Sequence, residues 1–182
     1  MRKEIVKLIS GAAGIGIVVL VAFTAGQMVD RENVLERITQ WPDLAVQTLE
    51  GDKIATGQLL FGVPVLFNYF NTECVFCQAE IEDIAEHTAL QDAVTLVFIS
   101  DEDPEILEWF RHKYGFDENP NVLFLFDTGG VVKEYYRIRS VPATYIYNSE
   151  GKLIEFFRGS VKAEALYSHV TAMGKEAEWD MR

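Results

Sequence analysis

Between residues 41 and 173, two kinds of segment alternate along the chain, and they differ in how their apolar residues are spaced. Continuous apolar runs are typical of strands buried on both faces, whereas apolar positions three or four residues apart predict helices with one buried side. In chain order the expected elements are a hairpin (44–49 and 54–56), a strand (63–70), a helix ending near 87, a strand (94–99), a helix (104–114), a strand (122–126), a short helix or turn (131–136), a second hairpin (143–147 and 153–158) and a helix (162–173). Because helices alternate with the central strands, we expect an α/β fold with a mixed sheet sandwiched by helices.

The first 28 residues depart from this pattern and predict a transmembrane helix that anchors the chain. Residues 8–28 carry no charge, and about 20 residues at about 1.5 Å each cross a hydrocarbon core. A cleaved signal has an apolar region of only about 7 to 15 residues, so we favour an uncleaved anchor, with cleavage near Gly26 as the alternative. Residues 29–40 are expected to form a short helical tether, and residues 174–182 a polar, frayed tail.

The charges on either side of the apolar run predict the orientation in the membrane. Arg2, Lys3 and Lys7 precede the run, and acidic residues outnumber basic ones just after it. By the positive-inside rule, the amino terminus stays in the cytoplasm and the following domain lies on the extracytoplasmic, periplasmic side. Leaving out the first 28 residues removes three positive charges and one negative charge, so the net charge changes from −12 to −14. The exported domain is therefore strongly acidic.

Length and composition narrow the classes of function. The chain has 182 residues, which suits one compact domain with modest extras, and 49% of them are hydrophobic, which is enough for a core. With 16 Lys and Arg against 28 Asp and Glu, the protein would repel a phosphate backbone, so we expect no nucleic-acid partner. Two cysteines are too few for a disulfide-rich scaffold or for a zinc site made of thiolates alone.

Cys74 and Cys77 are the most informative residues because they lie where a predicted strand gives way to a helix. At the amino terminus of a helix, unpaired backbone N–H groups and the helix dipole stabilise a thiolate, as redox chemistry requires. A zinc site needs two more ligands, and the three histidines are scattered over three predicted helices. We therefore expect a redox pair, with no metal and no cofactor beyond a reversible Cys74–Cys77 disulfide.

The residues around this pair resemble those of a known family. The block VLFNYFNTECVFCQAE at 65–80 is similar to the active-site block of thioredoxin-fold proteins, and is most similar to the membrane-tethered TlpA/ResA type, which shares Asn68 and Glu80. Residues 140–145, SVPATY, resemble the cis-proline loop of the family, and Gly159 stands at its late glycine. The resemblance covers residues 41–173 and implies a thioredoxin-like mixed sheet flanked by helices.

The resemblance also implies roles for single residues. Cys74 would be the exposed nucleophile and Cys77 the thiol that resolves the mixed disulfide. Pro142, in a cis peptide bond, would pack beside the disulfide and present the backbone of Val141 to an extended substrate segment. Proton exchange with the thiols is expected of Glu80 if it is buried with a raised pKa, and a solvated surface carboxylate is the alternative.

Two positions depart from the family pattern. Glu73 stands where the family usually has tryptophan, and its charge should raise the pKa of a neighbouring thiolate. Phe76 stands where the family usually has proline, and it offers an apolar surface to a substrate. The stretch 71–74 also lacks the proline and the correctly spaced threonine of peroxiredoxins, so we do not expect peroxidase activity.

The expected function is thiol-disulfide exchange with protein thiols and disulfides. The resemblance favours reduction of the substrate, with electrons supplied by a membrane-bound donor. Cytochrome c maturation is one pathway that uses such a reductase. Two other classes stay open at this point. A peptide-binding module would keep its affinity after both cysteines became serine, and a metal carrier would hold copper(I) or zinc through the two thiolates.

Overall fold

The computed structural model describes residues 33–59 and 62–179, with side chains described as far as residue 172. Residues 33–38 are helical, as expected for the tether. Among the described helices, none combines the length and the apolar character needed to cross a bilayer, and the predicted anchor at 8–28 lies outside these residues. The chain divides into two units, residues 1–37 and 38–182, and the second unit holds the sheet.

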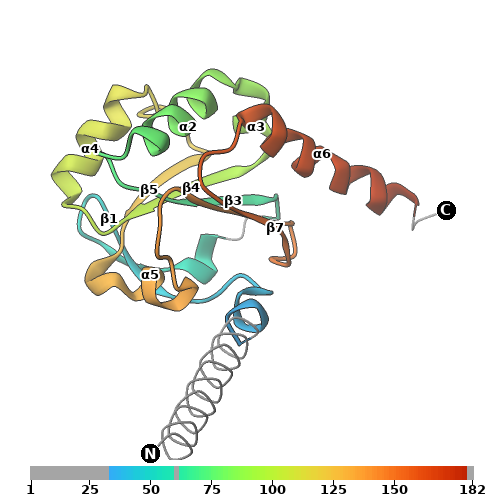
Figure 1. Ribbon diagram of the computed structural model, residues 1–182, viewed down its shortest axis with the longest axis horizontal. Coiled ribbons are helices and arrows are strands. Elements are labelled where there is room, and N and C mark those ends of the chain that lie inside the picture. Colours follow the sequence, from blue (N-terminus) through green and yellow to red (C-terminus); the bar gives the residue numbers. More distant parts are fainter. Residues whose placement is uncertain (1–32, 60–61, 180–182) are drawn as a thin grey trace, which may run out of the picture. The chain divides into compact units, whose positions relative to one another are not determined.

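A seven-stranded mixed sheet forms the centre of the second unit (Figure 1), in the order β2-β1-β5-β4-β3-β6-β7. Its strands are β1 (Ala45–Thr48), β2 (Lys53–Ala55), β3 (Val65–Tyr69), β4 (Thr95–Ser100), β5 (Val122–Phe126), β6 (Ala143–Tyr147) and β7 (Leu153–Arg158). The three central strands β3, β4 and β5 are parallel, and β6 pairs antiparallel with β3. The thioredoxin-like mixed sheet is therefore confirmed.

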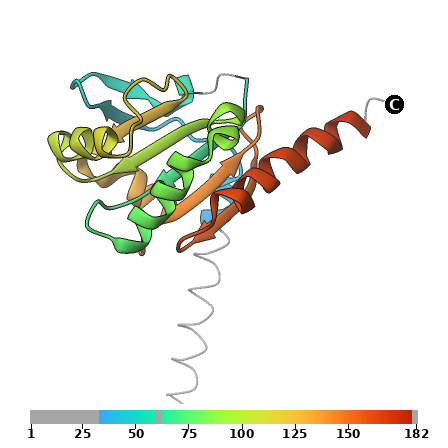
Figure 2. The same ribbon diagram turned by 90° about the horizontal axis from the view of Figure 1, so that it is seen from above.

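Helices cover both faces of this sheet. They are α2 (Val75–Glu86), α3 (Thr88–Ala93), α4 (Pro104–Lys113), α5 (Val131–Tyr136) and α6 (Ala163–Trp179), with short 3-10 turns η1 (Thr56–Leu59) and η2 (Thr128–Gly130). One apolar cluster contains Ile81 of α2, Leu107 of α4 and Leu166 of α6, so these helices share a face. In Figure 1, α2 and α4 lie above the sheet and α5 lies below it. Figure 2 shows α2 in green, α4 in yellow and α6 in red from above.

Two features differ from the expected helices. Helix α3 was not expected, and it forms because His87 ends α2 and caps the next turn, with its Nδ1 accepting a hydrogen bond from the Leu90 N–H at 3.1 Å. Helix α6 runs to Trp179, past the expected end at Met173, so the tail predicted at 174–182 begins inside the helix. Lys, Glu and Ala in that stretch favour helix strongly enough to extend it across one glycine.

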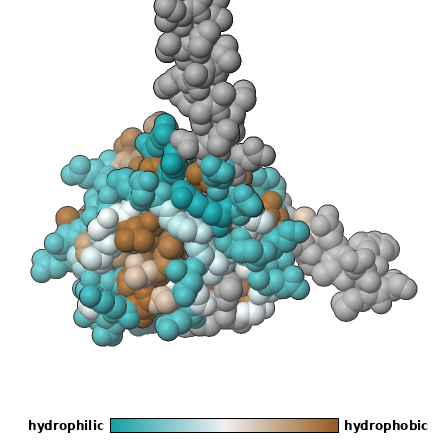
Figure 3. All heavy atoms as spheres, turned by 90° about the horizontal axis from the view of Figure 1, so that it is seen from below, coloured by the Kyte–Doolittle hydropathy of each residue, from teal (hydrophilic) through white to brown (hydrophobic). Residues whose placement is uncertain are grey.

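Strand β3 separates two different interiors. Successive side chains along this segment point to opposite faces of the sheet. Leu66 and Phe70 belong to the cluster under α2 and α4, whereas the ring of Phe67 packs against the ring of Tyr136 of α5, with 4.9 Å between the ring centroids. Asn68 lies between Leu66 and Phe70 and therefore faces α2. Figure 3 shows the molecule from below Figure 1, and on this face apolar side chains gather in a patch surrounded by hydrophilic ones.

Candidate active site

The turn between β3 and α2 places Cys74 at the start of the helix. The Cys74 N–H donates to the Asn71 carbonyl at 3.3 Å, and the Glu73 N–H donates to Asn71 Oδ1 at 3.0 Å, which closes the turn. Cys74 is the N-cap residue of α2, and its Sγ accepts a hydrogen bond from the Cys77 N–H at 3.3 Å. A thiolate at this position would receive a backbone N–H and the positive end of the helix dipole.

The two cysteines have different surroundings. Both are free thiols in this structure, with Cys74 partly exposed and Cys77 fully buried. Burial raises the pKa of Cys77 far above that of an ordinary thiol, and the hydrogen bond and charge of Cys74 raise it further. Cys77 is therefore protonated at neutral pH while Cys74 keeps a path to solvent. Of the two thiols, Cys74 is therefore the one that a partner molecule can reach.

The Val141–Pro142 peptide bond is cis, and it lies beside the first cysteine. The Cys74 thiol donates to the Val141 carbonyl at 3.8 Å, a normal distance for sulfur. Pro142 is buried, and its carbonyl accepts from the N–H of Gly159 at 2.9 Å. Gly159 has a φ of +97°, which favours glycine. The three segments that the sequence singled out, around 74, 142 and 159, thus meet at one place.

Glu80 lies one helical turn beyond Cys77 and is only 1% exposed, which excludes the solvated alternative. Its Oε1 accepts hydrogen bonds from Thr144 Oγ1 at 2.6 Å and from Asn68 Nδ2 at 3.1 Å. Asn68 Nδ2 also donates to Thr144 Oγ1 at 2.7 Å, across the pairing of β3 with β6. Within the described residues, Glu80 Oε2 has no hydrogen-bond partner. These three side chains form a polar triad beneath the cysteines.

Burial controls the ionisation of this triad. It raises the pKa of Glu80 to about 7, although Thr144, the nearby backbone N–H of Val161 and Asn68 all favour the carboxylate and lower the pKa. Glu80 therefore gains and loses a proton near neutral pH. Its charge also helps to raise the pKa of Cys77, so the carboxylate and the buried thiol are electrostatically linked.

The surface around Cys74 is apolar on one side and acidic on the other. Val75 and Phe76 are 71% and 66% exposed, a large fraction for apolar side chains in the first turn of a helix. Glu73 is exposed next to them. The two departures from the family pattern, Glu73 and Phe76, thus both lie at the surface beside the partly exposed thiol.

Thr144 belongs to this triad, although the sequence alone did not single it out. It lies two positions after Pro142, within the motif quoted for the cis-proline loop, but its role depends on the register that pairs Asn68 with Thr144. Among the described residues, no group of three or more His, Cys, Asp and Glu side chains is arranged to hold a metal ion. The predicted absence of a metal stays a prediction.

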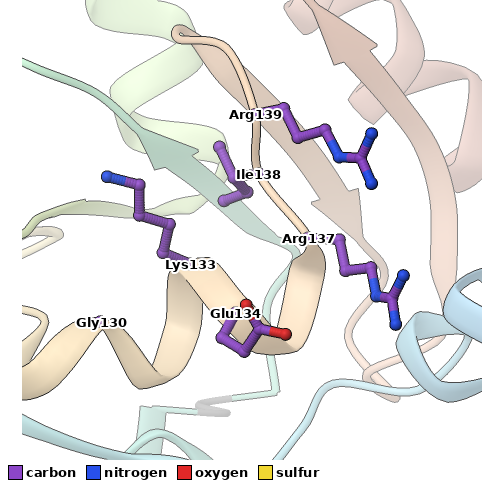
Figure 4. Close-up of a pocket in the computed structure, with 6 residues that line it drawn as sticks. All are labelled: Gly130, Lys133, Glu134, Arg137, Ile138 and Arg139. Atoms are coloured by element: carbon purple, nitrogen blue, oxygen red, sulfur yellow. The ribbon is translucent and has the colours of Figure 1, made fainter.

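A pocket of about 400 Å³ lies apart from the cysteines, between α5 and the segment that leads to Pro142 (Figure 4). Its lining consists of Gly130, Lys133, Glu134, Arg137, Ile138 and Arg139. In Figure 4 the side chains of Arg137 and Arg139 extend in the same direction. Lys133 Nζ forms an ion pair with Asp101 at 2.7 Å. Neither cysteine lines this pocket.

Comparison with known proteins agrees with this geometry. The AhpC/TSA family matches residues 39–156, which is more than half of the chain. The thiol-disulfide oxidoreductase ResA of Halalkalibacterium halodurans is 23% identical over 180 residues, covering 97% of this chain and 96% of the relative.

Solved structures give the same result. A secreted disulfide oxidoreductase of Mycobacterium tuberculosis, described as homologous to E. coli DsbE, is 26% identical with a TM-score of 0.61, covering 75% of this chain and 98% of that one. StoA from Bacillus subtilis, at 18% identity and a TM-score of 0.56, covers 72% of this chain and 98% of its own and shows the shared fold. The chain therefore belongs to the AhpC/TSA family and is a thioredoxin-fold protein of the ResA-like thiol-disulfide oxidoreductase type.

Proposed function

We propose that this protein is a membrane-anchored, extracytoplasmic oxidoreductase that reduces disulfides in protein substrates. The observation that carries the proposal is the position of Cys74, partly exposed at the N-cap of α2, with its Sγ bound by the N–H of a fully buried Cys77. A thiolate is the nucleophile in thiol-disulfide exchange, and this position stabilises one.

The proposed reaction has two balanced steps. The Cys74 thiolate attacks one sulfur of a substrate disulfide, forming a mixed disulfide and releasing one substrate thiolate. Cys77 then loses its proton and attacks Cys74 Sγ, which releases the second substrate thiolate and forms the Cys74–Cys77 disulfide. The substrate gains two electrons, the protein loses two, and each released thiolate takes up a proton. No cofactor is needed beyond this disulfide.

Glu80 is proposed to accept the proton of Cys77. The pKa of Cys77 is high partly because of its hydrogen bond to Cys74 and the charge of Cys74, and both contributions end once Cys74 is bound in the mixed disulfide. The thiol is then more acidic at the step in which it must ionise. Glu80, with a pKa of about 7 and an unpaired oxygen among the described residues, is one turn away to receive the proton.

The substrate segment is proposed to lie along the cis-proline loop. Its backbone would pair with that of Val141, whose carbonyl already contacts Cys74, and its apolar side chains would cover Phe76 and Val75. Pro142 holds this loop in place, and Asn68 supports Glu80 from β3.

The direction of exchange and the location are also part of the proposal. ResA and a secreted DsbE-like oxidoreductase are among the relatives, which supports an extracytoplasmic domain. The uncharged residues 8–28 and the basic residues before them support an anchor in the cytoplasmic membrane. Electrons would come from a membrane-bound donor, and cytochrome c maturation is the pathway proposed to consume them. Protease protection in spheroplasts tests the location, since a domain inaccessible from outside would contradict it.

A trapping experiment tests the proposed reaction. Cys77→Ser keeps the nucleophile but removes the second step, so mixed disulfides with substrate proteins should accumulate on Cys74 and dissolve with dithiothreitol. Cys74→Ser is the matched control and should trap none. Partners that remain bound to the double serine variant would support a binding module instead, and stoichiometric copper(I) on the wild-type thiolates with no trapped substrate would support a metal carrier.

A further inference from the structure

One carboxylate, that of Glu102 just after β4, binds the turn that precedes Cys74. Glu102 Oε2 accepts the backbone N–H of Thr72 at 2.6 Å, and Glu102 Oε1 accepts the Thr72 hydroxyl at 2.7 Å. Thr72 is buried and stands two residues before Cys74. Both donors of this residue are therefore held by a carboxylate that lies 30 residues further along the chain.

This contact is fixed at both ends. Ser100 Oγ, at the end of β4, donates to Glu102 Oε2 at 3.1 Å and accepts the Glu102 N–H at 3.3 Å. On the other side, Gln78 Nε2 of α2 donates to the Thr72 carbonyl at 2.6 Å. The turn before Cys74 is thus tied to the parallel sheet on one side and to its own helix on the other.

We infer that Glu102 is a positioning residue for the nucleophile. A carboxylate that binds two donors of one residue restricts the backbone of the turn, because hydrogen bonds to a charged group are stronger than neutral ones. The backbone of this turn determines where Cys74 Sγ lies relative to the Cys77 N–H. This inference rests on the proposed function, since it concerns the reactivity of Cys74.

The two properties of Glu102 act on Cys74 in opposite directions. Its hydrogen bonds hold the turn that stabilises a Cys74 thiolate, whereas its negative charge disfavours a thiolate nearby. Glu102→Ala removes both properties. Glu102→Gln removes the charge and keeps an oxygen for the Thr72 N–H and an amide for the Thr72 hydroxyl. The two variants therefore separate positioning from charge.

The experiment measures the alkylation rate of Cys74 against pH in the reduced full-length protein, with the labelled site read by mass spectrometry. Glu102→Ala should slow alkylation at pH 7 by at least about fivefold, the scale of one lost ordinary hydrogen bond, and the rates should converge at high pH. Glu102→Gln should react as fast as wild type or faster. Thr72→Val, which changes no charge, should also slow the reaction. It provides the test of positioning if Glu102→Ala does not fold.

Glu105→Gln is the matched control, because Glu105 is an exposed carboxylate three residues after Glu102, in the first turn of α4. Its profile should stay that of wild type. Faster alkylation in both Glu102 variants, or unchanged profiles in Glu102→Ala and Thr72→Val, would overturn the positioning role. If the wild-type protein forms a reversible Cys74–Cys77 disulfide while these profiles stay unchanged, only this inference fails. A wild-type protein that forms no such disulfide overturns the proposed function itself.

Discussion

Both faces of the central sheet bury polar atoms, but with different results. On the face under α2, Asn68 and Thr144 hold one oxygen of Glu80, and among the described residues its other oxygen has no partner. On the face toward α5, the Tyr136 hydroxyl pairs with that of Tyr147 at 2.9 Å, and Tyr147 also donates to the Ile38 carbonyl at 3.0 Å. The first group contains a carboxylate that can change its charge near neutral pH, and the second is a pair of neutral hydroxyls, on a face that also buries the carboxylate of Asp127.

The ionisation of these groups explains the difference. Burial raises the pKa of Tyr136 well above that of free tyrosine, so its hydroxyl stays neutral at every physiological pH. Burial raises the pKa of Glu80 to about 7, where it titrates. The same physical cause thus keeps the tyrosine neutral and makes the glutamate a proton acceptor, because a raised pKa moves a carboxyl group up from 4.5 toward the neutral range and moves a tyrosine from 10.0 further away from it.

The largest expected effect is on the face of the cysteines. Cys74→Ser removes the nucleophile, so turnover of a disulfide substrate with dithiothreitol as electron source should fall on the order of a thousandfold or more. The free energy of unfolding of the reduced protein should change little, because Cys74 is partly exposed. Substantial turnover in this variant would show that Cys77 or another group attacks first.

On the opposite face, Phe67→Ala should affect stability instead of chemistry. The ring is buried and packs against Tyr136 and Tyr145, so its loss should lower the free energy of unfolding in urea by about 3 to 5 kcal/mol. Ile154→Ala is the control, since this exposed side chain on β7 should cost less than about 0.5 kcal/mol. A change in the alkylation profile of Cys74 in folded Phe67→Ala would contradict the separation of the two faces.

Glu80→Gln should remove a pH dependence that wild type shows. The pKa of Glu80 is about 7 in the folded protein and 4.5 in the unfolded reference, so the folded state binds more protons between these values. Wild-type stability should therefore fall as pH rises through this window, by up to about 3 kcal/mol, and the variant should lack that fall. Urea unfolding at pH 5 and pH 8 measures both.

The same substitution should alter exchange near neutral pH. The step in the pH profile of turnover near pH 7 should disappear in Glu80→Gln, because glutamine cannot accept the proton of Cys77. Glu82→Gln is the matched control, an exposed carboxylate on the same helix. An unchanged profile in Glu80→Gln would leave the triad with a structural role alone.

The smallest effect is expected for Tyr147→Phe. It removes one hydroxyl and its two hydrogen bonds, so the free energy of unfolding should fall by about 1 to 2 kcal/mol. The loss should be the same at pH 5 and pH 8, because neither tyrosine ionises there. A loss that varied with pH would mean that the hydroxyl pair is coupled to a titrating group.

The sequence predicted the strands better than the contacts between them. The bounds of β5, β6 and β7 agree with the expected ones, because buried apolar runs between clear turns leave little choice. Helix α3 has six residues, too few for a helical period to be visible, and its start depends on the capping by His87. The extension of α6 past Met173 depends on helix propensity in a stretch without apolar periodicity.

The site shows the same division. Cys74, Cys77, Glu80 and Pro142 were found from their spacing and from the family resemblance, and the structure brings them together. Thr144 and Glu102 were not assigned roles, because their contacts join residues 64 and 30 positions apart and depend on the register of the sheet. Such contacts follow from topology, which a single sequence does not state.

The most direct test of the account is a redox titration of the full-length protein in detergent, followed by the intact mass after thiol labelling. The account predicts one reversible two-electron transition in which Cys74 and Cys77 both lose their labels, and the loss of that transition in Cys74→Ser and in Cys77→Ser. Two free thiols at every potential, or disulfides that form only between separate chains, would contradict the assignment of Cys74 and Cys77 as a redox pair.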